Sequence, residues 1–228
     1  MHVQRVVDLS RALGPGMQVY PGDPEVRFTA VATIDADGFW LNELTLGSQS
    51  GTHVDAPAHV VQGADATDLI SPRSLVAPAW IVDVTATAPL GLIEPETLAP
   101  TLRKARVGDA VVLRSGWDRF DGRDQAWSHP GLSVAGAQAL VRAGVSFIGL
   151  DFASVDRHGE AGLPAHQVLA HAGVPIVENL ANLDQVTWDL PLVVVGMLPL
   201  AGLDGAPARV FAIELEATPR PTSIGSTP

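Results

Sequence analysis

Short runs of β-branched and other apolar residues recur along the whole chain and predict a sheet-rich protein. The runs are short and rich in β-branched residues, as is typical of strands. Seven runs are expected to form strands: residues 26–34, 79–84, 110–113, 146–150, 174–177, 192–197 and 210–215.

Three segments have the start or stop signals of helices. Residues 95–105 begin with a proline suited to the first helical turn, residues 133–143 follow a serine that can cap a helix, and residues 164–172 end before Gly173. The mixed order of strands and helices predicts an α/β fold, in which a partly barrel-like sheet has its helices packed outside it. We expect one domain over residues 1–216 and a flexible tail over residues 217–228, which are rich in Pro, Thr and Ser.

Composition narrows the kinds of function open to this chain. With 228 residues the chain can bury a substantial core without disulfides, and it contains no cysteine. Any metal must therefore be held by His, Asp, Glu or amide oxygens. The net charge of -11 opposes binding to nucleic acid or to anionic membranes. The longest apolar stretch, residues 191–203, is too short to span a bilayer. These features predict a soluble cytoplasmic protein.

Candidate chemistry is concentrated in a short segment around His53. If this segment is extended, His53 and Asp55 point to the same side, about 7 Å apart, and can hold one metal ion. His59 lies six residues after His53. An extended chain would carry it roughly 20 Å away. The chain must therefore bend after Asp55 if His59 belongs to the same site, and Ala56-Pro57 is a suitable place for that bend.

The longer string Gly-Thr-His-Val-Asp-Ala-Pro-Ala-His, residues 51–59, resembles the signature H-x-G-T-H-x-D-x-P-x-H of the Putative cyclase family, to which bacterial kynurenine formamidase and isatin hydrolase belong. Residues 149–156 resemble a second family motif, G-x-D-x-x-S-x-D. Further blocks agree at residues 20–23, 114–117, 176–180 and 205–209, so the resemblance covers nearly the whole chain. It implies the swivelling β/β/α fold of that family.

The resemblance also implies a set of metal ligands. By position, His53 and Asp55 hold a first metal, and Asp55 with Glu178 bridges to a second, which His166 also holds. Gln49 replaces the first histidine of the signature. An amide oxygen is a weaker donor than imidazole toward zinc, so the first metal position is expected to bind zinc more weakly or to remain empty. The expected cofactor is a divalent metal, zinc or manganese, with one or two ions per chain.

The remaining roles follow from position and from chemistry. The resemblance implies that His59 is the proton donor and acceptor, and that Tyr20 contacts substrate where kynurenine formamidase has a tryptophan. A bound divalent metal lowers the pKa of its water from about 16 to about 7, and a neighbouring histidine can move a proton to the leaving group. A serine nucleophile is less favoured, because no G-x-S-x-G motif is present.

Several other polar residues have open or structural interpretations. Asp151 and Asp156 either orient the imidazoles of metal ligands or serve at strand ends and loops. His158 and His171 are expected at the surface, and His129, before Pro-Gly, in a turn.

The leading hypothesis is a metal-dependent hydrolase of a small amide, of the N-formyl aryl amine or cyclic amide (lactam) type. The alternatives are a cyclase or dehydratase acting on a polyketide-like intermediate, and a catalytically inactive binding protein. The partner is expected to be a small-molecule substrate. By resemblance to the family, the protein is expected to form a homodimer or homotetramer.

Overall fold

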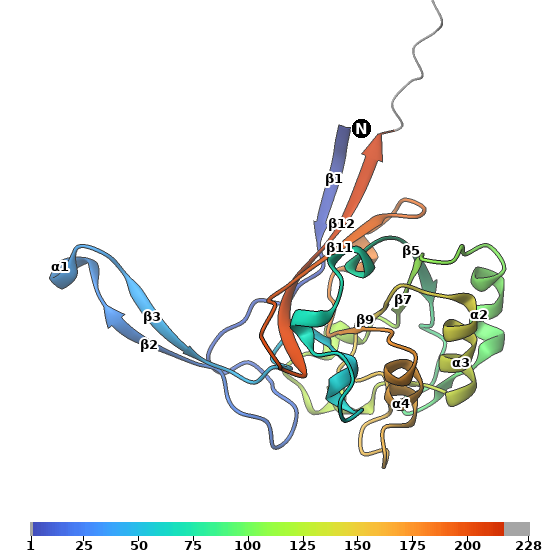
Figure 1. Cartoon of the computed structure of the whole chain (residues 1–228), viewed down its shortest axis with the longest axis horizontal. Helices are drawn as coiled ribbons and strands as arrows, with labels where there is room; N and C mark the ends of the chain where they lie inside the picture. The colour runs from blue at the N-terminus through green and yellow to red at the C-terminus, as the bar shows by residue number, and fades with distance from the viewer. Residues whose placement is uncertain (1, 217–228) are drawn as a thin grey trace, which may run out of the picture.

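The computed structural model describes residues 2–216 (Figure 1), so the expected tail at residues 217–228 lies outside the described residues. Eight strands form one sheet in the order β1-β12-β11-β5-β7-β9-β10-β4. An additional pairing between β12 and β4 closes seven of these strands into a barrel, with β1 attached outside the ring. The strands are β1 His2–Asp8, β4 His53–Asp55, β5 Val76–Asp83, β7 Ala110–Arg114, β9 Ile148–Leu150, β10 Ile176–Glu178, β11 Leu192–Met197 and β12 Gly205–Glu216.

The barrel strands follow from the apolar runs. β5, β7, β9 and β10 pair in parallel, whereas β4, β11 and β12 pair antiparallel with their neighbours. Parallel strands are buried on both faces, which requires continuous apolar sequence. Accordingly, the first four residues of β7, Ala-Val-Val-Leu, have no exposed surface.

Three helices cover one side of the barrel (Figure 1): α2 Pro95–Leu102, α3 Val134–Ala143 and α4 Pro164–His171. Leu98, Leu140 and Leu169 of these helices have no exposed surface and share one core with residues of β7 and β9. The Ser133 hydroxyl accepts from the Gly136 N–H at 3.0 Å, as expected of an N-terminal cap. The predicted helices are confirmed, and so is the α/β fold with helices outside a barrel-like sheet.

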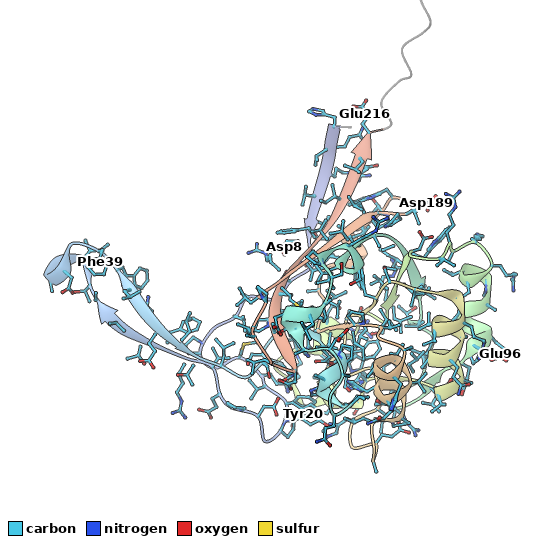
Figure 2. All side chains as sticks on the ribbon, in the orientation of Figure 1. Asp8, Tyr20, Phe39, Glu96, Asp189 and Glu216 are labelled. Atoms are coloured by element: carbon cyan, nitrogen blue, oxygen red, sulfur yellow. The ribbon has the colours of Figure 1, made fainter. Side chains whose placement is uncertain are left out.

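A hairpin of β2 (Arg27–Ala32) and β3 (Leu41–Thr45) extends away from the barrel, with the short helix α1 (Ile34–Asp37) at its tip (Figure 1). We call residues 27–45 the arm. The strand predicted over residues 26–34 is too long, because the Asp37 carboxylate accepts from the Thr33 N–H at 2.9 Å and turns the chain into α1. Side chains of the arm, Phe39 among them, point into open space (Figure 2).

The remaining elements are small. β6 (Leu92–Ile93) pairs in parallel with β8 (Gly131–Leu132). No helix among residues 2–216 is both long and apolar enough to cross a membrane. Short 3-10 helices form at η1 Pro57–His59, η2 Thr67–Leu69, η3 Pro72–Leu75, η4 Trp117–Phe120, η5 Asp124–Ser128 and η6 Leu183–Gln185.

Candidate metal centre

β4 lies between β10 and β12, and this arrangement places three of the expected metal ligands together. His53 is in register with Glu178 of β10, and Asp55 is in register with Gly205 of β12. The two alternate residues of β4 point the same way, as predicted. His53 Nε2 lies 3.3 Å from Asp55 Oδ1 and 3.6 Å from Glu178 Oε2, and all three residues are buried.

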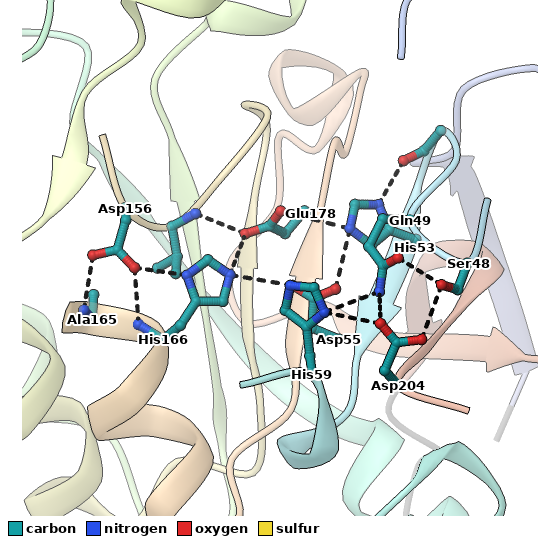
Figure 3. A network of polar contacts seen from close by, with 12 residues as sticks. Ser48, Gln49, His53, Asp55, His59, Asp156, Ala165, His166, Glu178 and Asp204 are labelled. Carbon is teal, nitrogen blue, oxygen red and sulfur yellow. Dashed lines mark hydrogen bonds and ion pairs between the residues drawn. The ribbon is translucent and has the colours of Figure 1, made fainter. Parts of the chain in front are cut away.

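The helix α4 brings in the fourth expected ligand. His166 Nε2 lies 3.4 Å from Asp55 Oδ2 and 3.6 Å from Glu178 Oε1. Its side chain is 3 % exposed. The structure therefore gathers His53, Asp55, His166 and Glu178 into one buried cluster (Figure 3).

Both imidazoles of the cluster are oriented through their Nδ1 atoms. His53 Nδ1 lies 2.8 Å from the Gly51 carbonyl oxygen, and His166 Nδ1 lies 2.7 Å from Asp156 Oδ2. Each Nδ1–H therefore donates to an acceptor, which leaves each Nε2 facing the carboxylates, where it can hold a proton or bind a metal ion. Of the two aspartates considered from sequence, Asp156 lies against a cluster imidazole, whereas Asp151 accepts hydrogen bonds from Ser115 and Gly116 in a loop.

The unpartnered atoms of this cluster fit a divalent cation. His53 Nε2 and both Asp55 oxygens are buried and have no hydrogen-bond partner among the described residues. Buried lone pairs at these distances repel one another unless positive charge lies between them. Histidine nitrogens and carboxylate oxygens are common ligands of zinc and manganese. Two overlapping groups, His53–Asp55–Glu178 and Asp55–His59–His166, each have ligand atoms within 4.8 Å of one another.

The pKa shifts in the cluster also show that its buried carboxylates favour a positive charge beside them. Burial lowers the pKa of His53, but the charge of Asp55 with the help of Glu178 more than offsets it and raises that pKa to about 10. Burial likewise opposes protonation of His166, while hydrogen bonds to Asp156 and Asp55 raise its pKa to about 10. The pKa of Asp55 is held well below its usual value by His53 and His166 despite burial.

The chain bends immediately after Asp55, as predicted. Pro57–His59 forms the 3-10 helix η1, and the His59 N–H donates to the Ala56 carbonyl at 2.9 Å. This bend brings the His59 ring to 5.8 Å from the His166 ring, measured between centroids. The His59 side chain is 26 % exposed, in contrast to the buried cluster beside it.

Gln49 lies next to His59 within a polar network (Figure 3). Its Nε2 is 3.0 Å from Asp204 Oδ2, and its Oε1 accepts from the Ser48 hydroxyl at 2.6 Å. Asp204 Oδ2 is also 3.0 Å from His59 Nδ1. Sequence reasoning missed Asp204, because an isolated aspartate one residue before the block 205–209 carries no chemical pattern of its own.

A cavity of about 280 Å³ opens beside the cluster and is lined by His53, Asp55, His59, His166 and Glu178. Aromatic and charged side chains complete its wall, including Arg11, Tyr20, Asp23, Trp117, Asp121, Trp127 and Phe152.

Tyr20 belongs to an aromatic group in this wall. Its ring lies 5.4 Å from the Trp127 ring and 5.3 Å from the His158 ring. His158, expected at the surface, thus packs against residues of the cavity wall.

His129 was expected in a turn, but it lies in the extended segment between η5 and β8 and is wholly buried. Its ring stacks on Phe152 at 5.4 Å, and its Nδ1 lies 2.8 Å from the Pro130 carbonyl oxygen. Burial lowers the pKa of His129 to about 4, so the ring is neutral at pH 7. The Pro-Gly pair suggested a turn. The burial of His129 depends on its packing against Phe152, which is distant in sequence and which the local pattern does not predict.

Comparison with known proteins agrees with this geometry. The family model described as "Putative cyclase" matches residues 7–157. Kynurenine formamidase from Salinibacter ruber is 34% identical over 210 residues, which cover 90% of this chain and 95% of that protein. Isatin hydrolase from Roseibium aggregatum is 28% identical, with 91% of each chain covered.

Solved structures show the same fold. The crystal structure of an isatin hydrolase bound to the product analogue thioisatinate aligns with a TM-score of 0.83 at 26% identity, covering 92% of both chains. A structure described as a potential metal-dependent hydrolase with cyclase activity aligns with a TM-score of 0.79 at 27% identity, covering 93% of this chain and 99% of the other.

The barrel, the cavity and the buried His–carboxylate cluster define a metal-dependent amidohydrolase. The chain belongs to the Putative cyclase family. The family, the fold class and the class of enzyme expected from sequence are thereby confirmed.

Proposed function

We propose that the protein hydrolyses a small, uncharged amide that carries an aromatic ring, of the N-formyl aryl amine or cyclic amide type. The observation that carries this proposal is that the Nε2 atoms of His53 and His166 lie 3.3 to 3.6 Å from carboxylate oxygens of Asp55 and Glu178. In this proposal His53, Asp55, His166 and Glu178 are the metal ligands.

The metal is proposed to be zinc or manganese, held by these four side chains. Asp55 is common to both groups of potential ligands, so its carboxylate would contribute to the binding of either one or two ions. A divalent metal bound there supplies an activated water and polarises the carbonyl of a bound amide.

His59 is proposed as the group that moves the proton. It lies next to the cluster but is more exposed than the proposed ligands, so its ring is open to the cavity. An imidazole in this position can accept a proton and then deliver it to a leaving nitrogen.

The cavity wall supports an aromatic and uncharged substrate. Tyr20 and Trp127 offer ring faces and edges, which favour an aryl group by stacking. Arg11 is the single arginine or lysine among the described lining residues, and its guanidinium is already paired with Asp121 at 2.6 Å. A substrate carboxylate would instead meet Asp23 and Asp121 in the wall.

The test is turnover of formanilide, a small lactam and a lactone, with metal content measured by mass spectrometry. We expect formanilide hydrolysis that stops when a chelator removes the metal and returns when zinc or manganese is added. His59→Ala should lower kcat by about 10²- to 10⁴-fold with metal content unchanged. The control is His171→Ala, at an exposed position of α4. A metal-free protein that binds no added metal, or full activity in His59→Ala, would contradict the proposal.

We also propose that the protein is a homo-oligomer, a dimer or tetramer, in which the arm packs on another copy of the chain. An isolated two-stranded ribbon is marginally stable in water. The arm leaves large apolar side chains open, with Ile34 67% exposed, Phe39 56% and Trp40 70%. Clustered exposure of this kind is typical of protein interfaces.

A further inference from the structure

We propose that Asp204 is a positioning residue for His59, and that Gln49 serves this pair and not the metal. The inference rests on the proposed function, because it assumes that His59 carries the proton. It assigns a role to the polar network beside the cluster and accounts for a glutamine at the position where the family signature has histidine.

Asp204 is held in place by both its backbone and its side chain. Its carbonyl oxygen accepts from the Ala56 N–H at 2.9 Å, directly before the helix η1 that carries His59. Its Oδ2 lies 3.0 Å from His59 Nδ1, and its Oδ1 lies 3.0 Å from the Ser48 hydroxyl, whose single proton it shares with Gln49 Oε1 at 2.6 Å. Burial opposes ionisation, but the hydrogen bonds from His59, Ser48 and Gln49 lower the pKa of Asp204, so the carboxylate is an anion at neutral pH.

An anionic acceptor at Nδ1 fixes the tautomer of His59. The proton of the neutral ring resides on Nδ1, where it donates to Asp204, and Nε2 is left with a lone pair that can accept a proton. The same carboxylate stabilises the imidazolium that forms once Nε2 is protonated. Asp204 thus prepares His59 to act as a base and then as an acid, without itself touching substrate.

Both ends of the Gln49 amide are already engaged. Its Oε1 accepts from Ser48, and its Nε2 donates to Asp204 Oδ2. The reversed amide would place an oxygen against the Asp204 carboxylate and is therefore disfavoured. The atom that could ligate a metal is the oxygen, whereas the nitrogen is the end beside His59, 3.3 Å from Nδ1.

The backbone at Gly205 lies directly against the side-chain amide of Gln49. A Cβ at Gly205 would overlap Nε2 of Gln49 and would lie 3.0 Å from the Val54 carbonyl oxygen. Any side chain at position 205 would therefore displace Gln49 from Asp204. Since Gly205 also pairs with Asp55 across β12 and β4, the network is built into the wall of the barrel.

The first experiment replaces Asp204 and measures kinetics and metal content together. Asp204→Asn keeps the size of the side chain but removes its charge. We expect kcat to fall by about 10- to 100-fold, with KM within twofold and metal content unchanged. The matched control is Asp68→Asn, an exposed aspartate that accepts from the Gly202 N–H at 2.9 Å and lies outside the network; it should retain full kcat. Loss of metal from Asp204→Asn, or an unchanged kcat, would overturn the proposal.

A second readout is independent of turnover. ¹⁵N NMR of the zinc-loaded protein reports the tautomer of each histidine ring, and His59→Gln identifies the signal of His59. We expect the Nδ1–H form in the wild type and a shift toward the Nε2–H form in Asp204→Asn. If no amide is hydrolysed but the tautomer changes as expected, the proposed function fails while the positioning role stands. An identical tautomer in both proteins would refute the positioning role.

The role of Gln49 is tested by Gln49→Ala. We expect the same number of metal equivalents per chain as in the wild type and a kcat several-fold lower, because Asp204 loses one of its donors. Loss of one metal equivalent would assign Gln49 to the metal and overturn that half of the proposal. Circular dichroism and thermal unfolding of each variant establish that it is folded.

Discussion

Asp156 accepts a hydrogen bond from His166 Nδ1 at 2.7 Å while it also accepts from the N–H of Ala165 and the N–H of His166, at 2.8 and 3.1 Å. One carboxylate thus fixes both the start of α4 and the orientation of the imidazole that α4 carries. Replacing Asp156 by Asn removes the charged acceptor for Nδ1–H and should weaken metal binding by about 10- to 100-fold. Competition with a chelator measures the affinity, and the exposed Asp184→Asn is the control. Equal affinities would show that Asp156 acts on the helix alone.

Metal removal should destabilise the folded protein. In the buried cluster His53 Nε2 and the Asp55 oxygens have no hydrogen-bond partner among the described residues, so bound metal favours the folded state. At a metal concentration of about 100 times Kd, the gain is about 3 kcal/mol, or roughly 5 to 10 °C in Tm. Calorimetry with and without chelator measures it. Glu178→Gln, which removes one carboxylate, should show a smaller gain, and a Tm indifferent to metal in the wild type would contradict this prediction.

His129 should make the protein sensitive to mild acid. Its folded-state pKa of about 4 lies below the value near 6.5 of an unfolded chain. The unfolded state therefore takes up a proton first as pH falls, so the stabilisation is complete above pH 6.5 and is lost down to about pH 4. The loss amounts to roughly 3 kcal/mol. Denaturant unfolding measures the free energy of unfolding of the wild type and of His129→Leu across this pH range, and the two curves should converge as pH falls. The control His171→Leu should follow the wild type. Parallel curves for His129→Leu and the wild type would exclude this role.

Gly131→Ala should disturb the metal centre from a distance. A Cβ at Gly131 would lie 2.6 Å from the Arg157 backbone nitrogen, so residues 156 and 157 would have to move. Overpacking of this kind costs about 1 to 3 kcal/mol of stability. Because Asp156 moves with this segment, metal affinity should fall as well. The control is Gly14→Ala, since among residues 2–216 no atom apart from those of its chain neighbours lies within 4 Å of a Cβ at Gly14. A variant that loses stability but keeps full metal affinity would separate the two effects.

The proposed oligomer should dissociate when the arm loses its aromatic surface. Replacement of Phe39 and Trp40 by serine should lower the mass measured by light scattering to that of a smaller assembly. The control is Val107→Ser, which changes an equally open apolar residue, 87% exposed, outside the arm. If the arm variant keeps the mass of the wild type, the interface lies elsewhere.

The sequence predicted the buried central strands of the barrel and missed two strands whose side chains are mostly exposed. β7 and β9 were found because burial on both faces requires unbroken apolar runs. β1 was not predicted, because its seven residues mix polar and apolar types and most are exposed. β3 was missed for the same reason, and α1 depends on a local hydrogen bond from Thr33 to Asp37.

For the candidate site, spacing along the sequence predicted the relative positions only of residues on or next to the single strand β4. The alternation of His53 and Asp55 and the bend before His59 follow from extended geometry and from Pro57. The approach of Glu178 depends on pairing between β10 and β4, and that of His166 depends on the position of α4. Both were expected from the family resemblance alone. Asp204 lies 145 residues from His59 in sequence, and no period or motif connects them.

The three-residue strand β4 is held on one side by β10 and on the other by β12, and β12 follows every other strand of the barrel along the chain. During translation, all four proposed ligands leave the ribosome before the strand that closes the ring around them. A nascent chain that ends before β12 therefore carries all four proposed ligands, but it lacks one of the two strands that pair with β4. The full set of strand pairings around the proposed ligands therefore exists only in a chain that includes β12, which comes after every other strand among residues 2–216.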